Sequence, residues 1–248
     1  MRVAALYDIH GNLPALESVL QEVHASDIEL VIVGGDIVPG PMSLEVLECL
    51  LHLDLPVQFI KGNCEIDALA EMKGTSAVRV PKAVREIMKW SAEQIFPAYE
   101  KLVAGWPKTL CLEIDRVGRV LFCHATPRDD NEIFTRLTPE ESLLPIFKSL
   151  DVDLVVCGHT HMQFDRMVGN IRVVNAGSVG MPFGEPGSDW LLLDGEVNLQ
   201  HTTYDLTKAA ERIRKTKYPQ AREFAANHVL QPPGEKQMLE AFARAQLQ

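Results

Sequence analysis

The amino-acid sequence has no surplus of basic residues. Its 248 residues include 24 Lys and Arg against 34 Asp and Glu, which gives a formal net charge of −10 with histidine neutral. Proteins that are held to nucleic acid or to an anionic membrane by bulk charge have the opposite balance. The charge therefore argues against long nucleic acid as a partner. It leaves a small phosphate ester open as a substrate, because a local site can have the opposite sign from the whole molecule.

Cysteine is scarce and long apolar runs are missing. The five cysteines are Cys49, Cys64, Cys111, Cys123 and Cys157. An odd and sparse set without a Cys-x-x-Cys pair does not suit a disulfide framework, and it predicts reduced thiols. No apolar run reaches about 18 residues, and Asp8 and His10 stand where a secretory signal would need its apolar segment. We therefore expect a cytoplasmic protein that does not interact with membranes.

Hydrophobic residues make up 46% of the chain, which is enough for the core of a single large domain over residues 1–248. Short β-branched runs alternate with segments of helical period, an order typical of the α/β class. The runs that predict strands are residues 3–7, 30–33, 57–60, 120–123, 154–157 and 171–174. Three helices are expected in the alternating part of the chain. The first covers 14–23 after a cap at Asn12, the second covers 44–51 after a cap at Ser43, and the third runs from a capping box at Thr138 to about residue 150.

Two segments depart from this alternation. Residues 66 to about 108 have helical patterns that are interrupted by Pro97 and Pro107, and they predict a helical insert. The insert either forms a cap over the site with Trp90 and Trp106 or buries both side chains as ordinary core. From residue 205 onward, apolar residues at helical spacing predict a C-terminal helical tail, 205–248. This tail covers an edge of the sheet or pairs with a second copy of the chain in a homo-oligomer.

Each of the first five strand-like runs ends, within a residue or two, in a side chain that can bind a metal. These side chains are Asp8, His10, Asp36, Asn63, His124, His159 and His161. Taken singly, an Asp or Asn there is an ordinary turn or cap residue, and a lone His is an ordinary core residue. Together they predict a site, because ligands collect beyond the carboxyl ends of strands in open α/β sheets.

The chemistry of this set is consistent with divalent ions. Asp, Asn and His without a thiolate suit hard to borderline ions. Mn²⁺ is the first expectation, and Fe²⁺, Zn²⁺, Co²⁺ and Ni²⁺ are alternatives. Six or seven ligands exceed what one ion needs and suit two ions that share a bridging carboxylate, which together can activate a water and clamp a phosphoryl group.

The five blocks resemble the signature of the calcineurin-like metallophosphoesterases, which reads D-x-H, G-D, G-N-[HC]-[ED], H and G-H-x-H. Here it stands as Asp8-Ile9-His10, Gly35-Asp36, Gly62-Asn63-Cys64-Glu65, His124 and Gly158-His159-Thr160-His161. The likeness is greatest to the small bacterial and archaeal predicted phosphodiesterases, whose third block carries Cys. The resemblance implies a four-layer α-β-β-α sandwich with a dinuclear site at one edge.

The resemblance also implies roles for the individual residues. It assigns Asp8, His10 and His161 to a first metal ion and Asn63, His124 and His159 to a second, with Asp36 as the bridge. A metal-bridging hydroxide is the implied nucleophile. The residues expected to carry catalysis are Asp36, His124 and Asn63.

Three positions bear on the reaction type. Cys64 replaces a His that many phosphomonoesterases of the family have, which favours diesters as substrates; alternatively, Cys64 is a small buried residue without a catalytic part. Arg128 either contacts a substrate phosphate or pairs with an acidic neighbour. Pro39 stands where an iron-tyrosinate site would require Tyr.

The function expected from these observations is a metal-dependent phosphodiesterase for a small nucleotide-like or dinucleoside polyphosphate substrate. Two alternatives stay open at this point. One is a phosphomonoesterase or phosphoprotein phosphatase, and the other is a non-catalytic scaffold of the same fold.

Overall fold

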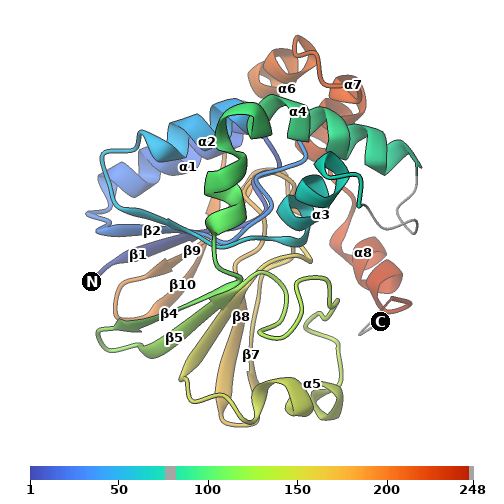
Figure 1. The fold of residues 1–248 in the computed structure, drawn as a ribbon. Coiled ribbons are helices and arrows are strands. Elements are labelled where there is room, and N and C mark those ends of the chain that lie inside the picture. Colours follow the sequence, from blue (N-terminus) through green and yellow to red (C-terminus); the bar gives the residue numbers. More distant parts are fainter. Residues whose placement is uncertain (76–81, 246–248) are drawn as a thin grey trace.

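The structure is a computed structural model that describes residues 1–75 and 82–245. Two five-stranded sheets lie face to face at its centre, and helices cover their outer faces (Figure 1). The layers follow in the order helix, sheet, sheet, helix, which confirms the predicted sandwich. Residues 76–81 of the predicted insert and 246–248 of the predicted tail lie outside the described residues.

The first sheet has the strand order β10-β9-β1-β2-β3. Strands β1 (Val3–Leu6), β2 (Leu30–Val33) and β3 (Val57–Phe59) run parallel to one another. Strands β9 (Ser188–Leu193) and β10 (Val197–Thr202) extend the sheet on the other side of β1 in antiparallel fashion.

The second sheet has the order β4-β5-β6-β8-β7. Its central strands β5 (Gly118–Cys123), β6 (Leu154–Cys157) and β8 (Ile171–Asn175) are parallel. The antiparallel strands β4 (Thr109–Ile114) and β7 (Phe164–Val168) form its two edges.

Strand β1 is apolar along its whole length because both of its faces are buried. Val3 and Ala5 pack between the two sheets, whereas Ala4 and Leu6 pack against the covering helices. Strand β2 divides its side chains in the same way. Continuous apolar runs of this kind are typical of parallel strands that are covered on both sides.

The first sheet is covered by α1 (Leu13–Ala25), α2 (Ser43–Leu51), α3 (Asn63–Met72) and α4 (Lys82–Gly105). The C-terminal tail adds α6 (Leu206–Arg214), α7 (Ala221–Phe224) and the π-helical turn η1 (Ala225–Leu230) to the same layer. On the second sheet lies α5 (Glu140–Phe147), and α8 (Glu235–Phe242) follows at the end of the chain. Figure 1 shows α6 and α7 of the tail beside α4.

Four local predictions about helices differ from the structure. Pro97 does not interrupt the helical pattern, since α4 continues through it, with a bend that is visible in Figure 1 and that a proline in a helix interior explains. Ser43 is the first residue of α2 rather than its cap, and its hydroxyl donates to the carbonyl of Gly40. Thr138 does not cap α5, because its hydroxyl oxygen accepts from the backbone N–H of Thr135. Helix α5 also ends at Phe147, earlier than predicted.

Other predictions about the chain agree with the structure. The side chain of Asn12 caps α1 by accepting from the N–H of Ala15, and the helix predicted after residue 205 is α6. All five cysteines are free thiols. Trp106 lies in the core, stacked on Phe59 with ring centroids 4.6 Å apart, so it packs as core. Within residues 1–75 and 82–245, no helix is long and apolar enough to cross a membrane.

Candidate metal centre

The seven predicted ligands meet where the carboxyl ends of both sheets face the same edge of the molecule. Backbone hydrogen bonds hold the loops of the first sheet together: the N–H groups of Asp8 and His10 donate to the carbonyls of Gly35 and Asp36. The second sheet is tied to the first through the N–H of His159, which donates to Asp8 Oδ2 at 2.8 Å. These bonds join the loops of both sheets, with the Asp8 carboxylate as the link between the sheets.

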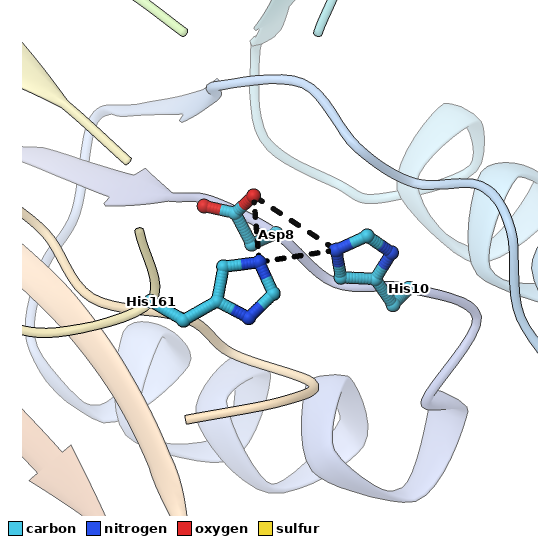
Figure 2. A group of neighbouring side chains, drawn as sticks. All are labelled: Asp8, His10 and His161. Atoms are coloured by element: carbon cyan, nitrogen blue, oxygen red, sulfur yellow. Dashed lines mark hydrogen bonds and ion pairs between the residues drawn. The ribbon is translucent and has the colours of Figure 1, made fainter. Parts of the chain in front are cut away.

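Asp8, His10 and His161 form the first group of ligand atoms (Figure 2). The Nε2 atoms of the two histidines lie 3.3 Å apart. Asp8 Oδ1 lies 3.3 Å from Nε2 of His161 and 3.9 Å from Nε2 of His10. All three side chains are buried.

A second group is formed by Asp36, His124 and His159. Nε2 of His124 lies 2.9 Å from Oδ1 of Asn63 and 3.5 Å from Oδ2 of Asp36. The same Oδ2 atom lies 3.8 Å from Nε2 of His10, which belongs to the first group. Asp36 thus faces both groups.

The hydrogen bonds of two histidines fix which ring nitrogen faces the centre. Nδ1 of His161 lies 2.8 Å from the carbonyl oxygen of Met181, and Nδ1 of His124 lies 2.9 Å from the carbonyl oxygen of Gly34. A carbonyl only accepts, so each Nδ1 carries a proton, and it is Nε2 that would present a lone pair inward when the ring is neutral. This is the tautomer that a metal ligand needs.

Hydrogen bonds within the described protein do not satisfy all of these inward-facing atoms. Asp8 Oδ1 is buried and has no hydrogen-bond partner among the described residues. A buried polar atom without a partner is unfavourable, and lone pairs that face one another repel. A divalent cation between Asp8, His10 and His161 would satisfy all three, so the donor set fits a metal ion.

The charges of the site are strongly coupled. Burial alone would raise the pKa of Asp36, but His124 and His10 hold that pKa well below its ordinary value. Burial would lower the pKa of His124, but Asp36 and Asp8 outweigh it and raise the pKa to about 10. For His159, burial together with His124 lowers the pKa to about 4. The two carboxylates are thus ionised and ready to hold a cation.

The backbone of the site is strained. Among the described residues, seven that are not glycine have a positive φ, and five of these are Asp8, His10, Asp36, His159 and His161. Left-handed backbone is unfavourable for residues with a Cβ and persists where the surrounding structure enforces it, often at functional sites. The strain here coincides with the predicted ligands, which supports a functional rather than a merely structural role for these loops.

Glycines let the loops approach one another. A Cβ at Gly158 would lie 2.4 Å from Asp8 Oδ2 and 2.6 Å from the ring of Tyr7, and a Cβ at Gly62 would lie 2.1 Å from Asp36 Oδ1. The glycines of the G-N and G-H blocks are therefore required by close packing against the two carboxylates.

We expect Gly158→Ala to lower the free energy of unfolding by about 2 kcal/mol, since overpacking a rigid core typically costs 1–3 kcal/mol. Urea denaturation measures this change. Gly105→Ala is the control, because a Cβ there meets nothing within 4 Å, and a surface change of this kind stays within about 0.5 kcal/mol. Equal midpoints for the two variants would contradict the close approach.

The two predicted substrate contacts differ in their surroundings. Arg128 is paired with an acidic neighbour, Glu132, and its Nε lies 2.9 Å from Oε1 of that carboxylate. Cys64 is half-buried beside the centre, and its backbone N–H donates to Asp36 Oδ1 at 3.0 Å. Burial and the charge of Asp36 raise the pKa of the Cys64 thiol well above its ordinary value. The thiol is therefore protonated in the metal-free protein.

Sequence analysis missed the part that Glu65 plays. Its buried carboxylate accepts from the backbone N–H groups of Asp36, Ile37 and Gly62 at 2.8–2.9 Å. It thereby ties the loop after β2 to the start of α3. The acidic residue that closes the third sequence block was the available signal.

Two aromatic residues near the site were also missed. The ring of Phe183 stacks on His161, with centroids 5.1 Å apart and planes at 18°. His228 of η1 shares a cavity with His10, and burial lowers its pKa to about 4, so its ring is neutral. Neither residue belongs to a recognisable motif, and both reach the site through long-range packing.

The chain is similar to known proteins over most of its length. A model of the calcineurin-like phosphoesterase superfamily domain matches residues 1–197, which include all seven predicted ligands. An uncharacterized protein of Methanocaldococcus jannaschii is 28% identical over 239 residues, covering 88% of this chain and 94% of that protein.

Two solved structures have a similar fold. One is a hypothetical protein from Pyrococcus horikoshii OT3, with a TM-score of 0.74 and 22% identity over 90% of this chain and 97% of the other. The second is a metallophosphoesterase from Sphaerobacter thermophilus, with a TM-score of 0.72 and 22% identity over 91% of this chain and 98% of the other.

Proposed function

The chain belongs to the calcineurin-like phosphoesterase superfamily and is a phosphate-ester hydrolase, and we propose that it is a phosphodiesterase for small esters that uses two divalent metal ions. Mn²⁺ is the first candidate for both ions. The observation that carries this proposal is the convergence of buried lone pairs from Asp8, His10 and His161 next to a second group around Asp36. The net charge of −10 makes a small ester a better candidate than a long nucleic acid.

In this proposal Asp8, His10 and His161 would hold one ion and Asn63, His124 and His159 the other, and Asp36 would be shared by both groups of ligands. Such a pair of ions supplies an activated water and neutralises charge that develops on the phosphoryl oxygens. The protein holds its ligands in fixed orientations, because the imidazoles of His124 and His161 are each bonded to a backbone carbonyl.

The position of Asp36 is determined by its neighbours. Its backbone N–H donates to Glu65, and its Oδ1 accepts from the N–H of Cys64. Oδ2 is thereby turned toward His124 and His10, which belong to different groups. This fixed orientation supports the role of Asp36 as the bridging carboxylate.

The preference for diesters rests on Cys64. A monoester benefits from an imidazole that protonates the leaving group or contacts the free phosphate oxygens, and general acids of this kind are worth roughly 10²–10⁴ in rate. Cys64 occupies the corresponding position with a protonated thiol, which is only a weak hydrogen-bond donor. We infer that diesters with good leaving groups are hydrolysed faster than monoesters.

The Cys64→His variant tests this preference. With Mn²⁺ present, we expect wild-type protein to have a higher kcat/KM for bis(p-nitrophenyl) phosphate than for p-nitrophenyl phosphate. The variant should lower the diester-to-monoester ratio by roughly tenfold or more, because the imidazole restores a proton donor. Cys64→Ser is the matched control, since it adds no imidazole. An unchanged ratio in Cys64→His would show that the residue has no such part, and a wild-type ratio below one would favour the phosphomonoesterase.

A further inference from the structure

A cavity of about 260 Å³ opens beside the candidate metal centre, next to His10 and Cys64. One wall comes from α4, which contributes Val84, Ile87 and Met88. Pockets that take a whole drug-sized ligand measure roughly 300–1,000 Å³, so this cavity suits one group of an ester whose phosphate lies at the metal centre.

The opposite wall comes from the C-terminal tail, beyond the segment that matches the family model. It consists of Tyr218, Gln220, Glu223, Phe224 and His228. This wall is well anchored: Phe224 is buried in the core above the first sheet, and the ring of Tyr218 meets Trp90 of α4 edge-on at 5.4 Å. The tail therefore forms a fixed part of the cavity.

The lining favours a flat aromatic occupant. Met88 and Met181 present thioethers, and Tyr218 and Phe224 present rings. Thioethers and aromatic rings both make favourable contacts with aromatic groups. No Lys or Arg is among the described residues that line the cavity, so it offers nothing to neutralise a second phosphate.

Two buried nitrogens of the lining lack a hydrogen-bond partner among the described residues, Nδ1 of His10 and Nδ1 of His228, and the second belongs to the tail. Nδ1 of His228 is buried, and no described residue accepts from it or donates to it. A neutral imidazole has one donor and one acceptor nitrogen, and a buried nitrogen without a hydrogen bond is unfavourable. A heterocycle with hydrogen-bonding atoms at its edge would meet this need as well as the apolar contacts.

We propose that this cavity binds the nucleobase of a nucleotide diester, with His228 at the edge of the base and the thioethers and rings of the cavity around it. The tail thus determines which esters reach the metal centre. The proposal rests on the proposed phosphodiesterase function for the position of the phosphate.

The test compares two diesters that release the same p-nitrophenolate from Mn²⁺-loaded protein: the p-nitrophenyl ester of thymidine 5′-phosphate and methyl p-nitrophenyl phosphate. We expect kcat/KM to be at least about tenfold higher for the thymidine ester, since burying one ring is worth more than the 1.4 kcal/mol that a factor of ten requires. A wild-type ratio near one would overturn the proposal while leaving the phosphodiesterase function intact.

Two variants, one on each wall of the cavity, ensure that the result does not depend on a single substitution. His228→Ala removes the polar partner, and Val84→Trp fills the cavity from an exposed position of α4. Each should bring the ratio of the two esters close to one. Asn227→Ala is the matched control, because Asn227 is exposed on the same turn and does not line the cavity. A ratio that stays high in both wall variants would contradict the proposal.

A binding measurement separates this proposal from the proposed function. By calorimetry on Mn²⁺-loaded protein, thymidine 5′-phosphate should bind at least about tenfold more tightly than methyl phosphate, a difference of about 1.4 kcal/mol. Both wall variants should lose this preference. If no diester is hydrolysed but the preference is found, the phosphodiesterase function fails and the cavity assignment stands. Equal binding of the two phosphates by wild-type protein would overturn the assignment.

Discussion

Replacing Asp36 with asparagine is expected to reduce kcat/KM for bis(p-nitrophenyl) phosphate by roughly three orders of magnitude or more, a loss of about 4 kcal/mol of transition-state stabilisation. The side chain keeps its shape, and its oxygen can still accept from the N–H of Cys64. The lost feature is the negative charge at Oδ2, which lies 3.5 Å from His124 and 3.8 Å from His10. An amide nitrogen there would place a donor toward the two cations. Steady-state hydrolysis in the presence of Mn²⁺ measures the effect.

The matched control is Asp54→Asn, which removes the same charge from an exposed position. Its turnover should equal that of the wild type. Urea denaturation of Asp36→Asn shows whether the fold is retained, so that a loss of activity is not confused with unfolding. Full activity of a folded Asp36→Asn protein would exclude the bridging role.

Removal of divalent metal should lower diester hydrolysis to the uncatalysed background, and added Mn²⁺ should restore it. The reason is that the three atoms Asp8 Oδ1 and Nε2 of His10 and His161 form a donor set for a cation and have no hydrolytic chemistry of their own. The thiol of Cys64 would not replace the metals as a source of the nucleophile, because burial and the charge of Asp36 raise its pKa and keep it protonated.

The same removal should lower the thermal stability. An ion at about 100 times its dissociation constant stabilises the folded state by about 2.7 kcal/mol. For a chain of this size that corresponds to a fall in Tm of roughly 5–10 °C when the ions are removed. Activity assays and calorimetric scans with EDTA, with EDTA followed by Mn²⁺, and without addition check both effects. Hydrolysis that continues in the chelated protein would contradict the role of the metals.

The sequence predicts the centre of the fold better than its edges. The central strands β1, β2 and β6 are uninterrupted apolar runs because both faces are buried. The edge strands β4, β7 and β10 were missed, since their exposed positions carry polar side chains such as Glu113, Asp165 and Gln200. Strand β9 was missed as well, although it is buried, because it begins with Ser188 and Asp189.

Some residues of the candidate site could likewise be predicted from the sequence, and others could not. The convergence of the seven predicted ligands could be anticipated because each follows the end of a strand, and parallel strands bring their ends to one edge. His228 could not be found in this way. Its place beside His10 depends on the packing of α6, α7 and η1 against α4, which is a property of the whole fold. The pairing of Arg128 with Glu132 was left open because several acids stand near it in the sequence.

The number of metal ions per chain tests the central proposal most directly. Protein grown with Mn²⁺ and purified without chelator can be analysed by mass spectrometry of its metals against the protein concentration. The proposed centre predicts two ions per wild-type chain, and His161→Ala should leave the second group of ligands intact and reduce the number to about one. A wild-type chain that binds one ion or none under these conditions would contradict the two-ion centre.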